Sequence, residues 1–158
     1  MQERDALSVE RVTVGAGRVE ALVRVDAGGP LRTSAIPYLS QEVLRLLPGI
    51  VRHRCECGSA HGIAAELGDT ELAHLLEHVA LELMALSGSP RSLQGETVWD
   101  FAKDGHGAFR VALEYDDDLV ALGALSEAAK IVNRLVDDPA ASLDVASAVA
   151  RLSAVRSG

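Results

Sequence analysis

One unusually apolar segment, Ala73–Leu83, most constrains how this chain folds, because it carries the pattern His-x-x-Glu-His inside one predicted helix. At about 100° of rotation per residue, His74 and His78 lie one turn apart on the same face and can share one tetrahedral zinc ion. Glu77 lies beside them, where a carboxylate can accept a proton from metal-bound water. A separate apolar stripe on the opposite side consists of Leu72, Leu76, Val79, Leu83 and Leu86. The histidines are therefore not needed to fill a core.

A zinc site that performs chemistry usually has three protein ligands and one water molecule, so one ligand must be found elsewhere. Glu82 lies one turn beyond His78, but three ligands from successive turns of one straight helix diverge along its axis. The segment before the helix offers further candidates, namely His53, Cys55, Cys57 and His61. A cysteine thiolate is a good zinc ligand. With a cysteine as the third ligand, Glu82 would be free to hydrogen-bond a ring nitrogen of a zinc-bound histidine. The alternative interpretation is an exposed polar helix face with ordinary side-chain pairs.

Length, composition and charge limit the class of protein. A chain of 158 residues with 48% hydrophobic residues favours one domain, residues 1–158, with a real core. The net charge of −8 and the lack of a Lys/Arg cluster argue against nucleic acid or a membrane surface as partner, and homo-oligomerisation stays open. The N-terminus resembles no export signal and no stretch has the length of a membrane span, so we expect a cytoplasmic protein.

Hydrophobic alternation and turn signals predict two β-hairpins and four helices. The first hairpin covers Val9–Asp26, and the second joins 97–101 to 108–115. The helices are predicted at about 35–47, 70–87, 116–137 and 142–155, with Asp69 or Thr70 capping the second of them. These elements predict an α+β fold in which one antiparallel sheet carries about four helices, packed mainly on one face.

Several motifs resemble the N-terminal domain of cyanophycin synthetase. They are Leu47-Pro48-Gly49-Ile50, His53-x-Cys55, Gly68-x-Thr70, the run His74–Leu83 and Gly95-x-Thr97. The resemblance covers about residues 35–137 and is most specific at His74–Leu83. In that family this domain precedes an ATP-grasp module and a Mur-ligase-like module, which add Asp and Arg to a polymer with an aspartate backbone and arginine side chains. This sequence shows no ATP signature, so polymerisation is not expected of the chain by itself.

The resemblance implies a metal site. Some members hold a metal between a Cys and the two His of the motif and cut the polymer into primers, with the Glu as base; the matching positions here are Cys55, His74, His78 and Glu77. The same pattern is similar to that of pitrilysin-type peptidases and S-ribosylhomocysteine lyase. This chain departs from the family pattern at 61–63 and at Glu96, where the family commonly has Gly-Gly-Phe and Arg, so the substrate is expected to differ.

Together these observations predict a hydrolase of amide or isopeptide bonds that uses Zn2+ and acts on cyanophycin or a related arginine-rich peptide. Glu77 would be its base, and the acidic charge balance is compatible with a cationic peptide or polymer. A second hypothesis is a non-catalytic module that binds peptide or polymer and holds a structural metal. A third is a zinc-dependent lyase acting on a small molecule.

Overall fold

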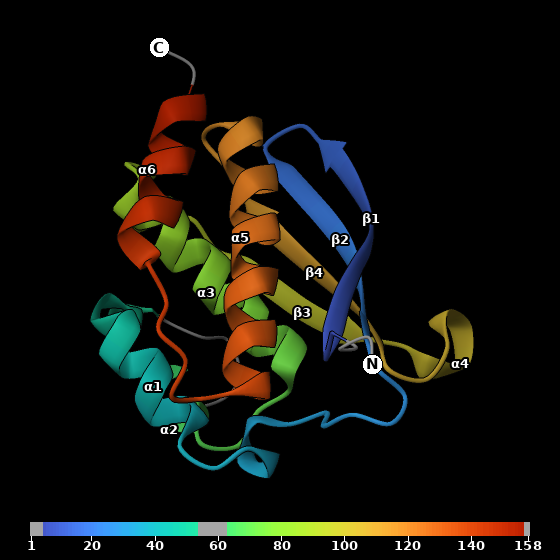
Figure 1. The fold of residues 1–158 in the computed structure, drawn as a ribbon. Coiled ribbons are helices and arrows are strands. Elements are labelled where there is room, and N and C mark those ends of the chain that lie inside the picture. The colour runs from blue at the N-terminus through green and yellow to red at the C-terminus, as the bar shows by residue number, and fades with distance from the viewer. Residues whose placement is uncertain (1–4, 54–62, 157–158) are drawn as a thin grey trace.

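The computed structural model describes residues 5–53 and 63–156, and it contains one four-stranded antiparallel sheet with helices on one face (Figure 1). The strands are β1 (Leu7–Gly15), β2 (Arg18–Val25), β3 (Gly95–Trp99) and β4 (Ala108–Glu114). Their order across the sheet is β1-β2-β4-β3. The predicted α+β architecture is therefore confirmed.

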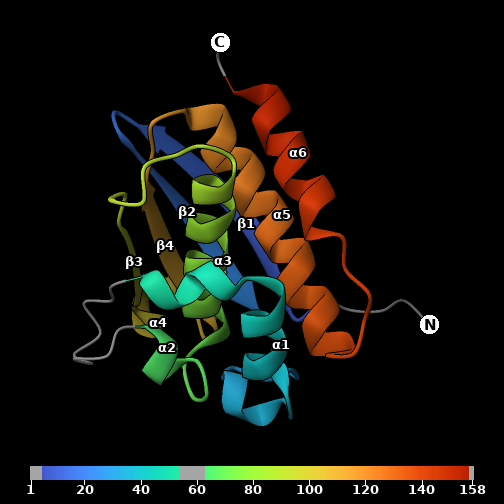
Figure 2. The same ribbon diagram turned by 90° about the vertical axis from the view of Figure 1, so that its left-hand side faces the viewer.

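Two long helices, α3 (Leu72–Leu86) and α5 (Asp118–Asp137), lie side by side on the sheet, and α6 (Val145–Val155) packs over them (Figure 2). The shorter helices are η1 (Thr33–Ala35), α1 (Leu39–Leu46), η2 (Pro48–Arg52), α2 (Ile63–Glu66) and α4 (Phe101–Asp104). The core fills the space between the sheet and these helices. On β2 every second residue is buried and faces it, namely Val19, Ala21, Val23 and Val25.

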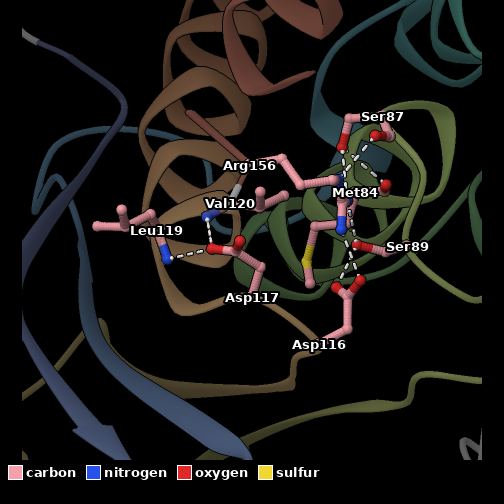
Figure 3. Close-up of polar contacts among 8 residues, drawn as sticks. All are labelled: Met84, Ser87, Ser89, Asp116, Asp117, Leu119, Val120 and Arg156. Carbon is pink, nitrogen blue, oxygen red and sulfur yellow. Dashed lines mark hydrogen bonds and ion pairs between the residues drawn. The ribbon is translucent and has the colours of Figure 1, made fainter. Parts of the chain in front are cut away.

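The C-terminal helix is tied to the end of α3 by a polar cluster (Figure 3). The Arg156 guanidinium donates to the Ser87 carbonyl oxygen at 3.1 Å, to Ser89 Oγ at 2.9 Å and to Asp116 Oδ2 at 2.6 Å. Ser89 Oγ donates to the other oxygen of Asp116 at 2.6 Å. Asp117 caps α5 by accepting from two backbone N–H groups of its first turn. Asp117 therefore caps α5, while Asp116 holds Arg156 at the end of α6.

Several predicted details are wrong. The first helix begins only at Leu39, because Tyr38 has a left-handed backbone with φ of 69°. The N-cap of α3 is Glu71, and Thr70 instead bonds a histidine ring. The second hairpin has no tight turn, since α4 lies between its strands. Leu86 is 45% exposed, because α3 ends there beyond the edge of the core.

Within 5–53 and 63–156, no helix combines the length and the apolar character that a membrane crossing requires. The cytoplasmic location stays a prediction.

Candidate functional site

The polar side chains of α3 are buried. His74 is 9% exposed, Glu77 3%, and His78 and Glu82 1% each. Helix α3 packs against the sheet, α5, α6 and η2, and the part of its polar face that these elements leave open lines a pocket. The alternative interpretation of an exposed polar helix face is therefore wrong, and each of these groups needs a partner inside the protein.

Three donor atoms of α3 converge on one point. His74 Nε2 lies 3.1 Å from His78 Nε2, and His78 Nε2 lies 3.2 Å from Glu77 Oε2. One such atom from each of the three residues falls within 4.8 Å of the other two. In a tetrahedral zinc site with bonds of about 2.0–2.1 Å, neighbouring ligand atoms lie about 3.3 Å apart. The spacing of these atoms is thus close to that of metal ligands.

Each of the three side chains makes a further polar contact with a residue outside the cluster. Thr70 Oγ1 lies 2.8 Å from His74 Nδ1, and Thr97 Oγ1 on β3 donates to Glu77 Oε1 at 2.8 Å. His78 Nδ1 lies 3.1 Å from Nδ1 of His53, which follows η2. Partners of this kind fix the orientation and tautomer of metal-binding side chains.

Behind His53 lies a second buried carboxylate. Glu82 Oε1 is 2.9 Å from His53 Nε2, and Arg91 donates to Glu82 through Nη1 at 2.7 Å and Nη2 at 3.2 Å. Burial raises the pKa of Glu82, but the hydrogen bonds from His53 and Arg91 outweigh it and hold the pKa below its ordinary value. Glu82 is therefore an ionised hydrogen-bond acceptor, and the His53 ring lies between it and His78.

This chain of contacts sets the proton positions. Ionised Glu82 requires a proton on His53 Nε2, so a neutral His53 accepts at Nδ1 from the N–H of His78 Nδ1. The lone pair of His78 Nε2 then points at His74 and Glu77. A proton or a divalent cation between these atoms relieves the repulsion of the facing lone pairs. The donor set is therefore compatible with a divalent cation, and equally with a proton that Glu77 donates to His78.

Burial shifts the pKa values of the same residues. It raises the pKa of Glu77 to about 7, against the opposing effect of the Thr97 hydrogen bond. It lowers the pKa of His78 to about 2, helped by the neighbouring His74 and His53, and it lowers the pKa of His74 as well. A divalent metal binds imidazoles in their neutral form, and it binds a carboxyl group after displacing its proton.

The cluster opens into a pocket of about 940 Å³. His74 and Glu77 lie on one side of it, and β3 forms another wall. Gly95 on β3 lets the strand approach, since a Cβ there would lie 2.8 Å from Glu77 Cγ. The pocket is also lined by charged side chains of both signs, including Arg32, Arg52, Glu66, Glu71 and Glu96.

The predicted site residues fall into two groups. His74, Glu77 and His78 are brought together, and Glu82 and His53 lie behind them. The other ligand candidates, Cys55, Cys57 and His61, lie outside the described residues. The sequence did not reveal the roles of Thr70, Arg91 and Thr97, and its only signal for them was the match of Thr70 and Thr97 to family motifs.

A family model, the cyanophycin synthase-like N-terminal domain, matches residues 22–137. The chain belongs to this family. A cyanophycin synthetase of Synechocystis sp. is 32% identical over 106 residues, which cover 66% of this chain and 12% of the relative. Cyanophycin synthetases of Geminocystis herdmanii and Crocosphaera subtropica are 28% and 29% identical, and 66% of this chain matches each. The chain thus spans only 12–14% of the length of these relatives.

These findings correct the functional prediction. The relatives are named synthetases, so the prediction of a zinc metallohydrolase is wrong, whereas the catalytic role of Glu77 stays a prediction. The comparisons support neither the non-catalytic module nor the small-molecule lyase, and they give no support to a likeness to pitrilysin-type peptidases. The physical reason is that His-x-x-Glu-His specifies only a local helical arrangement, which leaves the reaction open. What remains is membership of a family of cyanophycin synthase-like N-terminal domains.

Proposed function

We propose that the chain takes part in the synthesis of cyanophycin or a related polymer, by holding a segment of the polymer in the pocket beside α3. The family match over residues 22–137 carries this proposal, because it contains the whole of α3 and β3 and so both walls of the pocket. The names of the relatives place such domains in synthetases.

The charges of the pocket suit such a ligand. A polymer with an aspartate backbone and arginine side chains presents guanidinium groups along a peptide chain. Glu66, Glu71 and Glu96 offer carboxylates at the pocket wall, where Glu96 pairs with Arg18 at 2.7 Å and Glu71 lies 3.6 Å from Arg32, so a guanidinium group of the ligand would share or replace these contacts. Guanidinium groups pair with carboxylates through two parallel hydrogen bonds. The acidic net charge of −8 adds a weak general attraction for a cationic polymer.

The test is binding of synthetic aspartate-backbone peptides that carry arginine, measured by isothermal titration calorimetry. We expect a dissociation constant on the order of 10–100 µM, which weakens at high salt. Replacing Glu66 and Glu71 with Gln should weaken binding about tenfold, because two carboxylates facing the ligand are lost. The control Glu10→Gln, on β1 and outside the pocket lining, should leave binding unchanged. Equal binding of an arginine-free polyaspartate, or no binding, would contradict the proposal.

We also propose that His74, His78 and Glu77 hold Zn2+ at the side of this pocket. The three convergent donor atoms and the outer partners on each support this assignment. When bound, the ion would supply positive charge and an open coordination position for an oxygen of the ligand. The residues themselves orient the ion: Thr70 and His53 fix the two rings, and Thr97 fixes the carboxylate.

Metal content tests this second proposal. After dialysis against Zn2+ and then against metal-free buffer, elemental analysis should find about one zinc per chain. His78→Ala should bind zinc at least 100-fold more weakly, because the central donor is lost. His106→Ala is the matched control, since His106 lies in the turn before β4 and outside the cluster. Zinc retained equally by both variants would refute the assignment.

A further inference from the structure

The two edges of the sheet differ in how they are closed. At the β1 edge, the Asn133 side chain of α5 donates to the Leu7 carbonyl oxygen and accepts from the Leu7 N–H, both at 2.9 Å. An irregularity in the register between Val9 and Arg11 disrupts the same edge further along. Blocked and bulged edges resist the addition of another strand.

The β3 edge has no such protection within the part of the chain that the structure describes. Glu114 N–H donates to the Gln94 carbonyl oxygen, and Gln94 and Glu114 are in register with the pairs of β3 and β4. Since bonded pairs alternate in an antiparallel ladder, Glu96 and Val98 direct their N–H and C=O groups at β4. Gly95, Thr97 and Trp99 direct theirs away from the sheet. Among the described residues, none of these outward groups has a hydrogen-bond partner.

This open edge faces the pocket. The pocket lining contains β3 and the residue before it without interruption, from Gln94 to Trp99. The Thr97 side chain bonds Glu77, so the outward backbone groups of Thr97 lie next to the convergent donor atoms of α3. A row of unpaired backbone groups along the wall of a roomy pocket is the arrangement that binds an extended peptide by strand addition.

The side chains along β3 indicate the chemistry of that peptide. Glu96 projects on the outer side of the sheet, where its carboxylate pairs with Arg18 at 2.7 Å and would be shared with a basic side chain that a neighbouring strand places opposite it. Trp99 is 58% exposed, and its ring lies 4.6 Å from that of Phe101, centroid to centroid, which supports it from behind. A supported, exposed indole face binds guanidinium or ammonium groups. Both features favour basic side chains.

We propose that an extended polypeptide bearing basic side chains adds to β3 as a fifth strand, with its backbone bonded to Gly95, Thr97 and Trp99. This inference rests on the proposed binding of a peptide polymer and specifies how the backbone is held. Only an α-peptide backbone in extended form matches the spacing of the three outward residues. One basic side chain then lies over the Trp99 ring, and another lies beside Glu96.

Amide hydrogen exchange by NMR tests the proposal on the full chain, with the synthetic arginine-bearing aspartate peptide as the probe. On addition of the peptide, the N–H groups of Gly95, Thr97 and Trp99 should gain at least about tenfold protection. Those of Glu96 and Val98, already bonded to β4, should change little. Trp99→Ala should weaken binding several-fold, whereas Tyr38→Ala, which removes an exposed aromatic ring away from the pocket, should not.

Peptides N-methylated at alternate residues provide the matched control. Methylation of the residues that face β3 should weaken binding about tenfold or more, and methylation of the residues between them should not. Binding without protection of the three amides, or equal binding of both methylated peptides, overturns strand addition while leaving polymer binding in place. The absence of any binding overturns both. Protection that grows with protein concentration before peptide is added would show a second copy on this edge and would also overturn the inference.

Discussion

Replacing Glu77 with Gln is expected to stabilise the metal-free protein by about 2–3 kcal/mol at pH 8. The Glu77 side chain is almost wholly buried, and burial raises its pKa from 4.5 to about 7. Above pH 7 the native state therefore contains a carboxylate that water would solvate better. Glutamine keeps the acceptor for the Thr97 hydroxyl but carries no charge, so it removes this cost.

The sign of the pH dependence follows from the two pKa values. Between pH 4.5 and about 7, native Glu77 binds more protons than it does in the unfolded chain. Stability therefore falls as pH rises through this window. At pH 4 the carboxyl is largely protonated in the native state and half or more protonated in the unfolded chain, so most of the advantage of Glu77→Gln should vanish.

Denaturant unfolding of both proteins in a chelating buffer, at several values between pH 4 and pH 8, measures this difference. The control is Glu20→Gln on β2, because the Glu20 side chain is 49% exposed and is not among the groups that shift the pKa of Glu77, so it should show no such pH-dependent gain. A difference between wild type and Glu77→Gln that is the same at pH 4 and pH 8 would contradict the assignment. With saturating Zn2+ the order should reverse, since an ion that binds only the native wild type stabilises it.

The sequence predicted those parts of the site that depend on one helix. His74, Glu77 and His78 converge because helical spacing alone brings positions i, i+3 and i+4 together. The same argument could not place Thr97, which is 20 positions from Glu77 and meets it only because β3 packs beside α3. Nor could it show that His53 lies between His78 and Glu82. Residues joined by tertiary packing leave no periodic signal.

The fold was predictable for a similar reason. The alternation on β2 reports directly which side chains face the core, and the antiparallel sheet followed from it. The helix start at Leu39 was missed because Tyr38 adopts a backbone conformation that a bulky residue rarely takes. The reaction was mispredicted because a motif on one helix was interpreted as a mechanism, whereas the family match covers β3, β4, half of β2 and the two long helices.

Removing the Arg91 guanidinium is expected to cost about 2–3 kcal/mol of stability at pH 7. Arg91 makes two hydrogen bonds to Glu82, whose carboxylate is 1% exposed. In Arg91→Met that carboxylate keeps only His53 among the described residues, so a buried charge loses its main cation. Arg45→Met is the control, because the Arg45 and Glu42 pair lies at the surface and should contribute less than about 0.5 kcal/mol.

The loss should depend on pH in the direction opposite to that of Glu77. The native pKa of Glu82 lies below its ordinary value, so the pair stabilises the wild type above pH 4.5 and this contribution fades as pH falls. The deficit of Arg91→Met should therefore be largest near neutral pH and shrink toward pH 4. Denaturant unfolding at both values measures it, and an equal deficit at the two would contradict the buried-charge explanation.

The double variant Glu82→Gln with Arg91→Met separates the charge from the packing. With no carboxylate left to compensate, the double variant should recover more than half of the stability that Arg91→Met loses. Its zinc affinity should nevertheless stay about tenfold below wild type, because a neutral amide in place of the Glu82 carboxylate no longer fixes the proton on His53 that orients His78. Recovery of folding without recovery of zinc affinity would show that the buried ion pair acts on the metal-binding ring through His53. Full recovery of both would show that the pair serves only the fold.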